Sequence, residues 1–177
     1  MAENPHFREL LQTLNDCEVR YLIVGGYAVM KYTEPRYTKD LDVWVENSVG
    51  NALRVFDALK RFGAPLESDG VTPETFTGNE TTYQIGLAPL RVDILTQITG
   101  VEFSAAWSRR VRGMIFGIPV PFISLDDLIV NKRETGRSSD LDQLKHISKN
   151  WNWEIRVNVI VLSELFTGYK RKQSLTL

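Results

Sequence analysis

Hydrophobic and polar residues follow two repeats along this chain, one typical of helices and one typical of strands. Near the start, apolar residues recur at helical spacing after Asn4-Pro5, where Asn can cap a helix and Pro can begin it. A second helical stripe follows Asn47-Ser48 and ends at Gly63, a residue type common just beyond a helix. The apolar face predicted for this second helix consists of Val49, Ala52, Leu53, Phe56, Leu59 and Phe62.

Short apolar runs bounded by turn residues predict the strands, which span residues 21–24, 41–45, 82–87 and 90–95. A tight hairpin is expected at residues 114–122, and its Pro119 and Pro121 should confine it to a sheet edge, because proline cannot donate a ladder hydrogen bond. The Gly-, Pro- and Thr-rich residues 64–82 lack a clear period and predict a long, irregular, exposed segment. Phe76 within it either packs or stacks on a base, and packing is the preferred interpretation.

This mixture of elements predicts an α/β (α+β) protein, with a mixed β-sheet flanked by helices. A chain of 177 residues is long enough for one domain with a single core. We expect residues 1–149 to form that domain. The pattern changes at residue 150, and residues 150–177 are expected to be a C-terminal extension, to which the sequence assigns no role.

Two motifs in the first third of the chain carry the candidate chemistry. Gly25 and Gly26 follow the first strand, where glycine lets backbone approach a ligand and a following helix directs free N–H groups at an anion. Asp40 and Asp42 lie two positions apart in the next strand, so both side chains point to one face. Such carboxylates repel unless a cation or a proton lies between them, and they suit Mg²⁺.

A third carboxylate, Asp93, lies inside an apolar strand. A carboxylate at such a position is costly unless it is paired, hydrogen-bonded or bound to metal. Two explanations therefore stay open from the residues alone. Asp93 either forms a salt bridge with Arg91 or lies at a sheet edge, or else it joins the earlier pair of aspartates in one site.

The order Val24-Gly25-Gly26, then Asp40-Leu41-Asp42 within an apolar strand, resembles the signature of the nucleotidyltransferase superfamily, which has the DNA polymerase β-like (palm-like) fold. Small stand-alone bacterial members are similar over about residues 7–147, including those grouped with abortive-infection toxins of the AbiEii type. In this family a third carboxylate follows on a later strand, and Asp93 matches it.

The resemblance implies transfer of a nucleoside monophosphate from an NTP to an acceptor hydroxyl, with release of pyrophosphate. It also implies two Mg²⁺ ions, or Mn²⁺ in their place, with Asp40 and Asp42 holding both ions and Asp93 holding the one that activates the acceptor. Asp93 is also a candidate general base for the acceptor hydroxyl. Gly25 and Gly26 would bind the β- and γ-phosphates through backbone N–H groups.

Basic residues around these motifs leave further alternatives. Arg36 and Lys39 either are solvated, with Lys39 offsetting the aspartates, or contact a triphosphate. Residues 132–140 are similar to a K-x4-R-x2-D run that supports the active site in many small family members. Lys132, Arg137 and Asp140 occupy the matching positions. The alternative is that these three simply mark helix ends with favourable charges.

Composition narrows the partners. A net charge of −1 argues against non-specific coating of nucleic acid, although the cluster Arg109, Arg110 and Arg112 is either a solvated face or a local substrate patch. The single cysteine, the polar N-terminus and the lack of a long apolar run predict a cytoplasmic protein without a membrane partner.

Candidate acceptors for the reaction that the resemblance implies are a tRNA 3′ end, a protein hydroxyl and a small antibiotic, bound with help from a homodimer or a partner protein. The rival hypothesis is a non-catalytic interaction protein or toxin–antitoxin component built on the same fold.

Overall fold

The computed structural model describes residues 4–33, 38, 40–78, 80–87, 90–136, 140, 142 and 147 of the 177-residue chain. Six strands form one mixed sheet in the order β3-β4-β2-β1-β6-β5. They are β1 (Tyr21–Ile23), β2 (Asp40–Val45), β3 (Thr82–Ile85), β4 (Arg91–Leu95), β5 (Val111–Ile115) and β6 (Ile118–Phe122). The pairs β2–β4 and β1–β6 are parallel, and the other neighbours are antiparallel.

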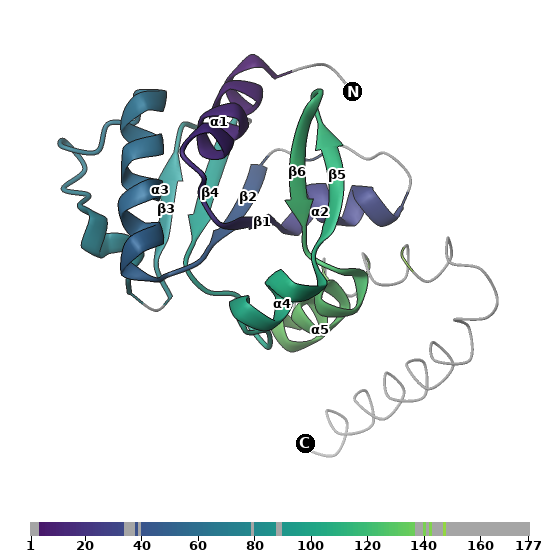
Figure 1. Ribbon diagram of the computed structural model, residues 1–177. Coiled ribbons are helices and arrows are strands. Elements are labelled where there is room, and N and C mark those ends of the chain that lie inside the picture. Colours follow the sequence, from purple (N-terminus) through teal and green to yellow (C-terminus); the bar gives the residue numbers. More distant parts are fainter. Residues whose placement is uncertain are drawn as a thin grey trace, which may run out of the picture.

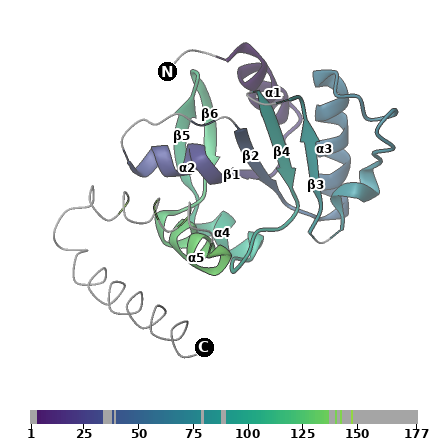
Figure 2. The ribbon, with the colours of Figure 1, turned by 180° about the vertical axis from the view of Figure 1, so that it is seen from behind.

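Helices lie on both faces of this sheet. They are α1 (Pro5–Asp16), α2 (Gly25–Tyr32), α3 (Val49–Phe62), α4 (Phe103–Arg109) and α5 (Leu125–Thr135), with a 3₁₀ helix η1 (Pro73–Phe76). Figure 1 shows α1 and α3 on one face, and Figure 2, turned by 180°, shows α2 in front of the opposite face, with α4 and α5 at one end of the sheet. The expected mixed sheet flanked by helices is therefore confirmed.

The alternation of side chains along β2 separates the core from the polar face. Leu41 and Val43 are fully buried in the main hydrophobic cluster, whereas Asp40 and Asp42 are only partly buried on the other face. Side chains alternate between faces along a strand, so this six-residue strand contributes to both the core and a polar site.

The first helix forms as its sequence predicts. Asn4 lies in an extended conformation and its side-chain oxygen accepts hydrogen bonds from the backbone N–H groups of His6 and Phe7, while Pro5 begins the helix. Its buried stripe is Phe7, Leu10, Leu11 and Leu14. The helix therefore begins at its predicted cap and buries its predicted face.

The apolar face predicted for α3 was partly wrong. Val49 and Leu53 are 70% and 55% exposed, and the buried residues are Asn51, Ala52, Val55, Ala58 and Leu59. The reason lies in the side chain of Asn51. Its Oδ1 accepts a hydrogen bond from the backbone N–H of Arg20, and its Nδ2 donates to the carbonyl oxygens of Arg20 and Glu46. These bonds tie the helix to the ends of β1 and β2 and rotate its inner face toward Asn51, because a buried amide must be satisfied.

The predicted hairpin is present and lies at one edge of the sheet, as expected, but its proline-bearing strand is not the outermost one. β5 is the edge strand, and β6 lies between β5 and β1. Strand β1 pairs with β6 only at Ile23 and Phe122, beyond Pro119 and Pro121. Because proline cannot donate a ladder hydrogen bond, the two prolines limit the contact with β1 to one end of the strand rather than excluding β6 from the sheet interior.

The segment expected to be irregular contains a defined turn. Thr72 and Thr75 form a reciprocal capping box at the start of η1. Phe76 is fully buried and meets Tyr83 edge to face, with ring centroids 6.2 Å apart. Packing of Phe76 is therefore confirmed.

None of the helices in the described part of the chain is long and apolar enough to cross a membrane.

Candidate active site

The first strand leads directly into the N-terminus of a helix. Helix α2 begins at Gly25 itself, so both glycines belong to its first turn. Gly25 has φ +58°, which favours glycine, and a Cβ atom placed there would overlap Oδ2 of Asp42. Gly25 is therefore required both by its backbone conformation and by the close approach of a carboxylate.

Strand register brings the predicted carboxylates together. In the parallel pair β2–β4, Asp42 lies opposite Asp93 and Asp40 lies opposite Arg91. Neighbouring strands are separated by about 4.8 Å, so the two carboxylates of the first pair are immediate neighbours on one face. The sequence predicted that Asp40, Asp42 and Asp93 would converge on one side of the sheet, and in the described structure they do so.

Arg91 joins two of these carboxylates. Its Nη2 atom is 3.0 Å from Oδ2 of Asp40 and 3.1 Å from Oδ2 of Asp93. Its Nε atom is 2.8 Å from Oδ1 of Asp93, but these two buried atoms are not aligned for a hydrogen bond, so we treat this contact as an ion pair only. The salt bridge that the sequence left open for Asp93 is therefore present together with the carboxylate cluster.

Among the residues that the structure describes, none is an arginine paired with Asp42, and the electrostatics of this carboxyl differ. Burial is the main cause that raises its pKa, to about 6, and the neighbouring charge of Asp93 adds to the effect. A hydrogen bond from the backbone N–H of Gly26 and the charge of Lys132 act in the opposite direction. A carboxyl of this kind gains from a cation nearby, since a cation favours its ionised form.

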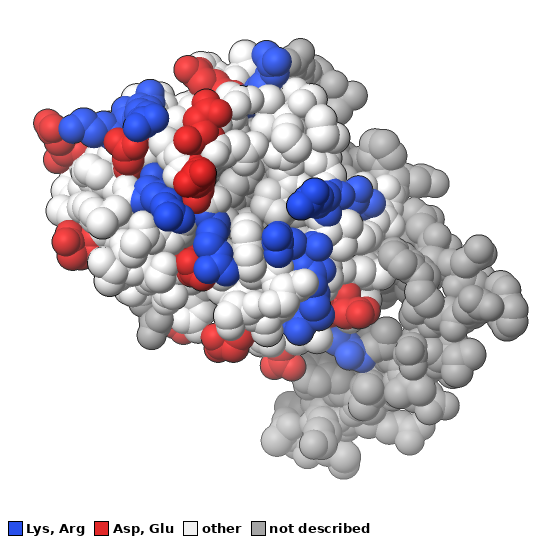
Figure 3. Space-filling view, in the orientation of Figure 1, with Lys and Arg blue, Asp and Glu red and all other residues white. Residues whose placement is uncertain are grey.

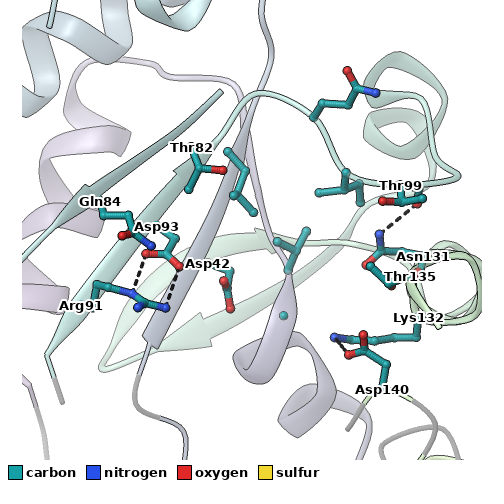
Figure 4. Close-up of a pocket in the computed structure, with 15 residues that line it drawn as sticks. Asp42, Thr82, Gln84, Arg91, Asp93, Thr99, Asn131, Lys132, Thr135 and Asp140 are labelled. Carbon is teal, nitrogen blue, oxygen red and sulfur yellow. Dashed lines mark hydrogen bonds and ion pairs between the residues drawn. The ribbon is translucent and has the colours of Figure 1, made fainter. Parts of the chain in front are cut away.

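These side chains open into a polar cavity of about 440 Å³ (Figure 4). Gly25, Asp42 and Asp93 line one part of it, and Lys132 and Asp140 line another. Lys132 Nζ lies 2.7 Å from Oδ1 of Asp140, and both side chains are almost fully buried. The predicted residues Lys132 and Asp140 thus line the same cavity as Gly25, Asp42 and Asp93, and they pair with each other.

The fit of these residues to a divalent cation can be tested on their own contacts. Within the described ranges, no three His, Cys, Asp or Glu side chains are grouped so as to hold a metal ion. The guanidinium of Arg91 lies between Asp40 and Asp93 instead. Asp42 is free of that guanidinium in the described structure, and the adjacent Asp93 would offer a second neighbouring carboxylate once Arg91 withdraws from it. This fits Mg²⁺, which usually takes one or two carboxylates together with waters and substrate phosphates.

Comparison with known proteins identifies the family. The model of a family described as "Nucleotidyl transferase of unknown function (DUF2204)" matches residues 4–175. The chain belongs to this nucleotidyl transferase family. The match extends through most of residues 150–177, and a search of curated proteins finds no match.

Solved structures support the fold of this nucleotidyl transferase. The antibiotic-resistance factor ANT(2'')-Ia is 12% identical, with a TM-score of 0.54 over 96% of each chain. TM1012 of Thermotoga maritima, described as a candidate nucleotidyltransferase, is 13% identical, with a TM-score of 0.52 over 78% of this chain and 88% of its own. At these identities the likeness establishes the nucleotidyltransferase fold. The narrower resemblance to AbiEii-type toxins stays a prediction.

The structure does not describe every residue that the sequence predicted for the site of this nucleotidyl transferase. Arg36, Lys39 and Arg137 fall outside the described residues. The basic cluster of Arg109, Arg110 and Arg112 does not line the cavity. Arg109 bonds Asp127 through two nitrogens, and Arg110 stacks over Trp107 at 4.1 Å. Figure 3 shows Lys and Arg gathered on the face that carries α4, and Figure 2 shows that α2 lies on the other face.

Several uncharged cavity residues were not found from the sequence. Thr82 and Gln84 project from β3, and Gln84 lies opposite Asp93 in the sheet register. Asn131 of α5 donates to the carbonyl oxygen of Thr99 and so ties the loop after β4 to that helix. The strand period of residues 82–87 could have indicated that Thr82 and Gln84 share a face, but only the pairing of β3 with β4 brings that face to Asp93.

Proposed function

We propose that this family member transfers a nucleoside monophosphate from an NTP to an acceptor hydroxyl. The acceptor oxygen would attack the α-phosphorus, the bond to the bridging oxygen would break, and pyrophosphate would leave. One observation carries the proposal. The adjacent carboxylates Asp42 and Asp93 line the same cavity as the glycine start of α2 and the amine of Lys132. That cavity therefore offers both groups that bind phosphate and groups that bind a cation.

The start of α2 is suited to the donor phosphates. Free N–H groups at the beginning of a helix favour an anion, and glycine leaves the approach open. The N–H of Gly26 is directed at Asp42 in the described structure, so it would bind phosphate only by exchanging that partner. We assign Gly25 and Gly26 to the β- and γ-phosphates, with Lys132 as a nearby positive charge. Arg137 and Lys39 stay assigned to the same role as predictions.

The aspartates are suited to the reacting centre. Asp42 and Asp93 would hold Mg²⁺, or Mn²⁺ in its place, with Asp40 as the third ligand of a two-ion site once its contact with Arg91 opens. The cation would neutralise charge that develops on the transferred phosphoryl group and the leaving pyrophosphate. Asp93 lies opposite Gln84, on the β3 side of the cavity. This position supports the assignment of Asp93 to the acceptor hydroxyl, and Asp93 would accept the proton of that hydroxyl.

The acceptor itself is proposed by class only. A tRNA 3′ end, a protein hydroxyl and a small molecule all carry the hydroxyl that this reaction needs. The structural neighbour ANT(2'')-Ia is named an antibiotic-resistance factor, which supports keeping a small antibiotic among the three. A homodimer or a partner protein would help to bind a larger acceptor.

The position of a radioactive label tests the reaction class. The protein is incubated with Mg²⁺, a host-cell lysate and each NTP labelled either at the α- or at the γ-phosphate. Transfer of a nucleotide predicts a labelled acceptor only from the α-labelled donor, and labelled pyrophosphate from the γ-labelled one. Acceptor labelling from the γ-labelled donor would contradict nucleotidyl transfer and would indicate phosphoryl transfer instead.

A further inference from the structure

Arg91 is placed by the sheet itself on the face that carries the candidate metal ligands. It lies opposite Asp40 across the β2–β4 pair and two residues before Asp93 on β4, so strand alternation directs it to the same face. Its nitrogens contact one oxygen of Asp40 and both oxygens of Asp93. Two of the three carboxylates are therefore engaged by one guanidinium.

This arrangement leaves no room for a shared cation on the same oxygens. A divalent ion bound by Asp40 and Asp93 needs ligand oxygens at about 2.1 Å, and a guanidinium held between those carboxylates occupies the space and repels the ion. One of the two positive groups has to leave. Because Asp42 has no guanidinium partner in the described structure, it is the carboxylate that stays available to a cation while Arg91 remains in place.

The contacts of Arg91 are of a kind that can be exchanged. Its side chain is one-third exposed, whereas that of Asp93 is only one-tenth exposed, so the arginine can move more easily than the aspartate. The Nε contact is not aligned as a hydrogen bond, and the strong two-bond fork of arginine with one carboxylate is therefore incomplete. Arg91 also lines the cavity, where an incoming phosphate offers the guanidinium a new partner.

Resting on the nucleotidyl transfer proposed above, we infer that Arg91 is a positioning residue that exchanges Asp40 and Asp93 for nucleotide phosphate when the cation binds. Without nucleotide it neutralises the two carboxylates and weakens cation binding. With nucleotide it turns to the phosphates and releases Asp40 and Asp93. Cation and nucleotide therefore bind cooperatively, and Arg91 is the residue that couples them.

The test measures Mn²⁺ binding by electron paramagnetic resonance, which detects free Mn²⁺, with and without a non-hydrolysable NTP analogue. Arg91→Gln should bind Mn²⁺ at least tenfold more tightly than wild type when nucleotide is absent. Adding the analogue should tighten binding strongly in wild type and much less in Arg91→Gln. Arg112→Gln, an exposed change on β5, serves as the matched control and should behave as wild type.

Arg91→Lys provides a second variant that keeps the charge, and it should give an intermediate Mn²⁺ affinity, because an ammonium group cannot bridge two carboxylates as a guanidinium does. Equal or weaker Mn²⁺ binding by folded Arg91→Gln without nucleotide would overturn the inference, while the proposed function would stand if wild type still binds Mn²⁺ with the analogue. If neither protein binds Mn²⁺ even with the analogue, both the inference and the metal-dependent function fail.

Discussion

At the scale of single residues, Asp42 differs most from its ordinary behaviour. Its carboxyl is desolvated and lies beside Asp93, and its pKa is raised to about 6. A raised pKa means that the folded protein prefers the protonated form. The stabilising contribution of this proton is complete below the ordinary pKa of about 4 and is lost as the pH rises through 6. Near neutral pH the ionised Asp42 therefore lowers the free energy of unfolding in the absence of a cation.

Replacing Asp42 by asparagine should stabilise the metal-free protein above pH 7. The shift in pKa corresponds to about 3 kcal/mol, or roughly 9 °C in melting temperature, and the gain should vanish below about pH 4. Thermal unfolding of wild type and Asp42→Asn between pH 4 and 8 measures this. Glu67→Gln, an exposed carboxylate change, is the control. A destabilised Asp42→Asn protein at pH 8 would contradict the assigned environment.

The same residue should control the response to ligand. Wild type should gain stability from Mg²⁺ or Mn²⁺ with NTP, because a ligand that binds only the folded state stabilises it. The gain in wild type should fall as the pH drops below 6, where Asp42 takes up its proton. Asp42→Asn should show a smaller gain at every pH. Equal rises in melting temperature for the two proteins would remove Asp42 from the proposed ligand set.

At the scale of elements, the site depends on how the start of α2 fits against β2. The sequence predicted strand β2, its apolar and polar faces, and a glycine turn before α2, because local patterns determine these features. It predicted the inner face of α3 only in part, since Asn51 is buried by hydrogen bonds to β1 and β2 that no helical period reveals. The register that places Gly25 against Asp42 is likewise a tertiary feature.

Glycine substitutions separate backbone strain from the close approach to Asp42. Gly63→Ala introduces a side chain at φ +86° into open space and should cost about 1 kcal/mol of unfolding free energy. Gly25→Ala introduces similar backbone strain and also an overlap between the new Cβ and Asp42. It should therefore lower the unfolding free energy by more than ~3 kcal/mol and abolish NTP binding. Gly50→Ala, inside α3 with free space around it, should stabilise slightly. Urea unfolding measures all three, and equal costs for Gly25→Ala and Gly63→Ala would refute the contact.

The buried ion pair between Lys132 of α5 and Asp140 should contribute to the unfolding free energy. Either Lys132→Met or Asp140→Asn alone should lower the unfolding free energy by ~3 kcal/mol, because the remaining charge is left buried without a partner. The double variant Lys132→Met with Asp140→Leu should regain most of that stability yet bind NTP poorly. Chemical denaturation and nucleotide binding check the two halves. Full NTP affinity in the folded double variant would argue against Lys132 as a phosphate ligand.

At the scale of the whole molecule, the functional face is built by pairing strands that are distant in sequence. The alternation of side chains along the strands predicted that Asp40 and Asp42 share a face and that Asp93 could join them. The sequence could not predict that β4 lies parallel and directly beside β2, because β3 and a long loop intervene between them. That pairing sets Asp42 opposite Asp93 and Asp40 opposite Arg91.

The central claim is that this member of the nucleotidyl transferase family is an enzyme whose reacting centre includes Asp93. The most direct measurement compares transfer from α-labelled NTP with NTP binding in wild type, Asp93→Asn and the surface control Asp57→Asn. Asp93→Asn should fold, bind NTP within about threefold of wild type and lose at least ~100-fold of its transfer rate, as removal of a transition-state interaction predicts. Asp57→Asn should keep both activities. Undiminished transfer by Asp93→Asn would contradict the catalytic assignment, and NTP binding without any transfer by wild type would favour a binding protein on this fold.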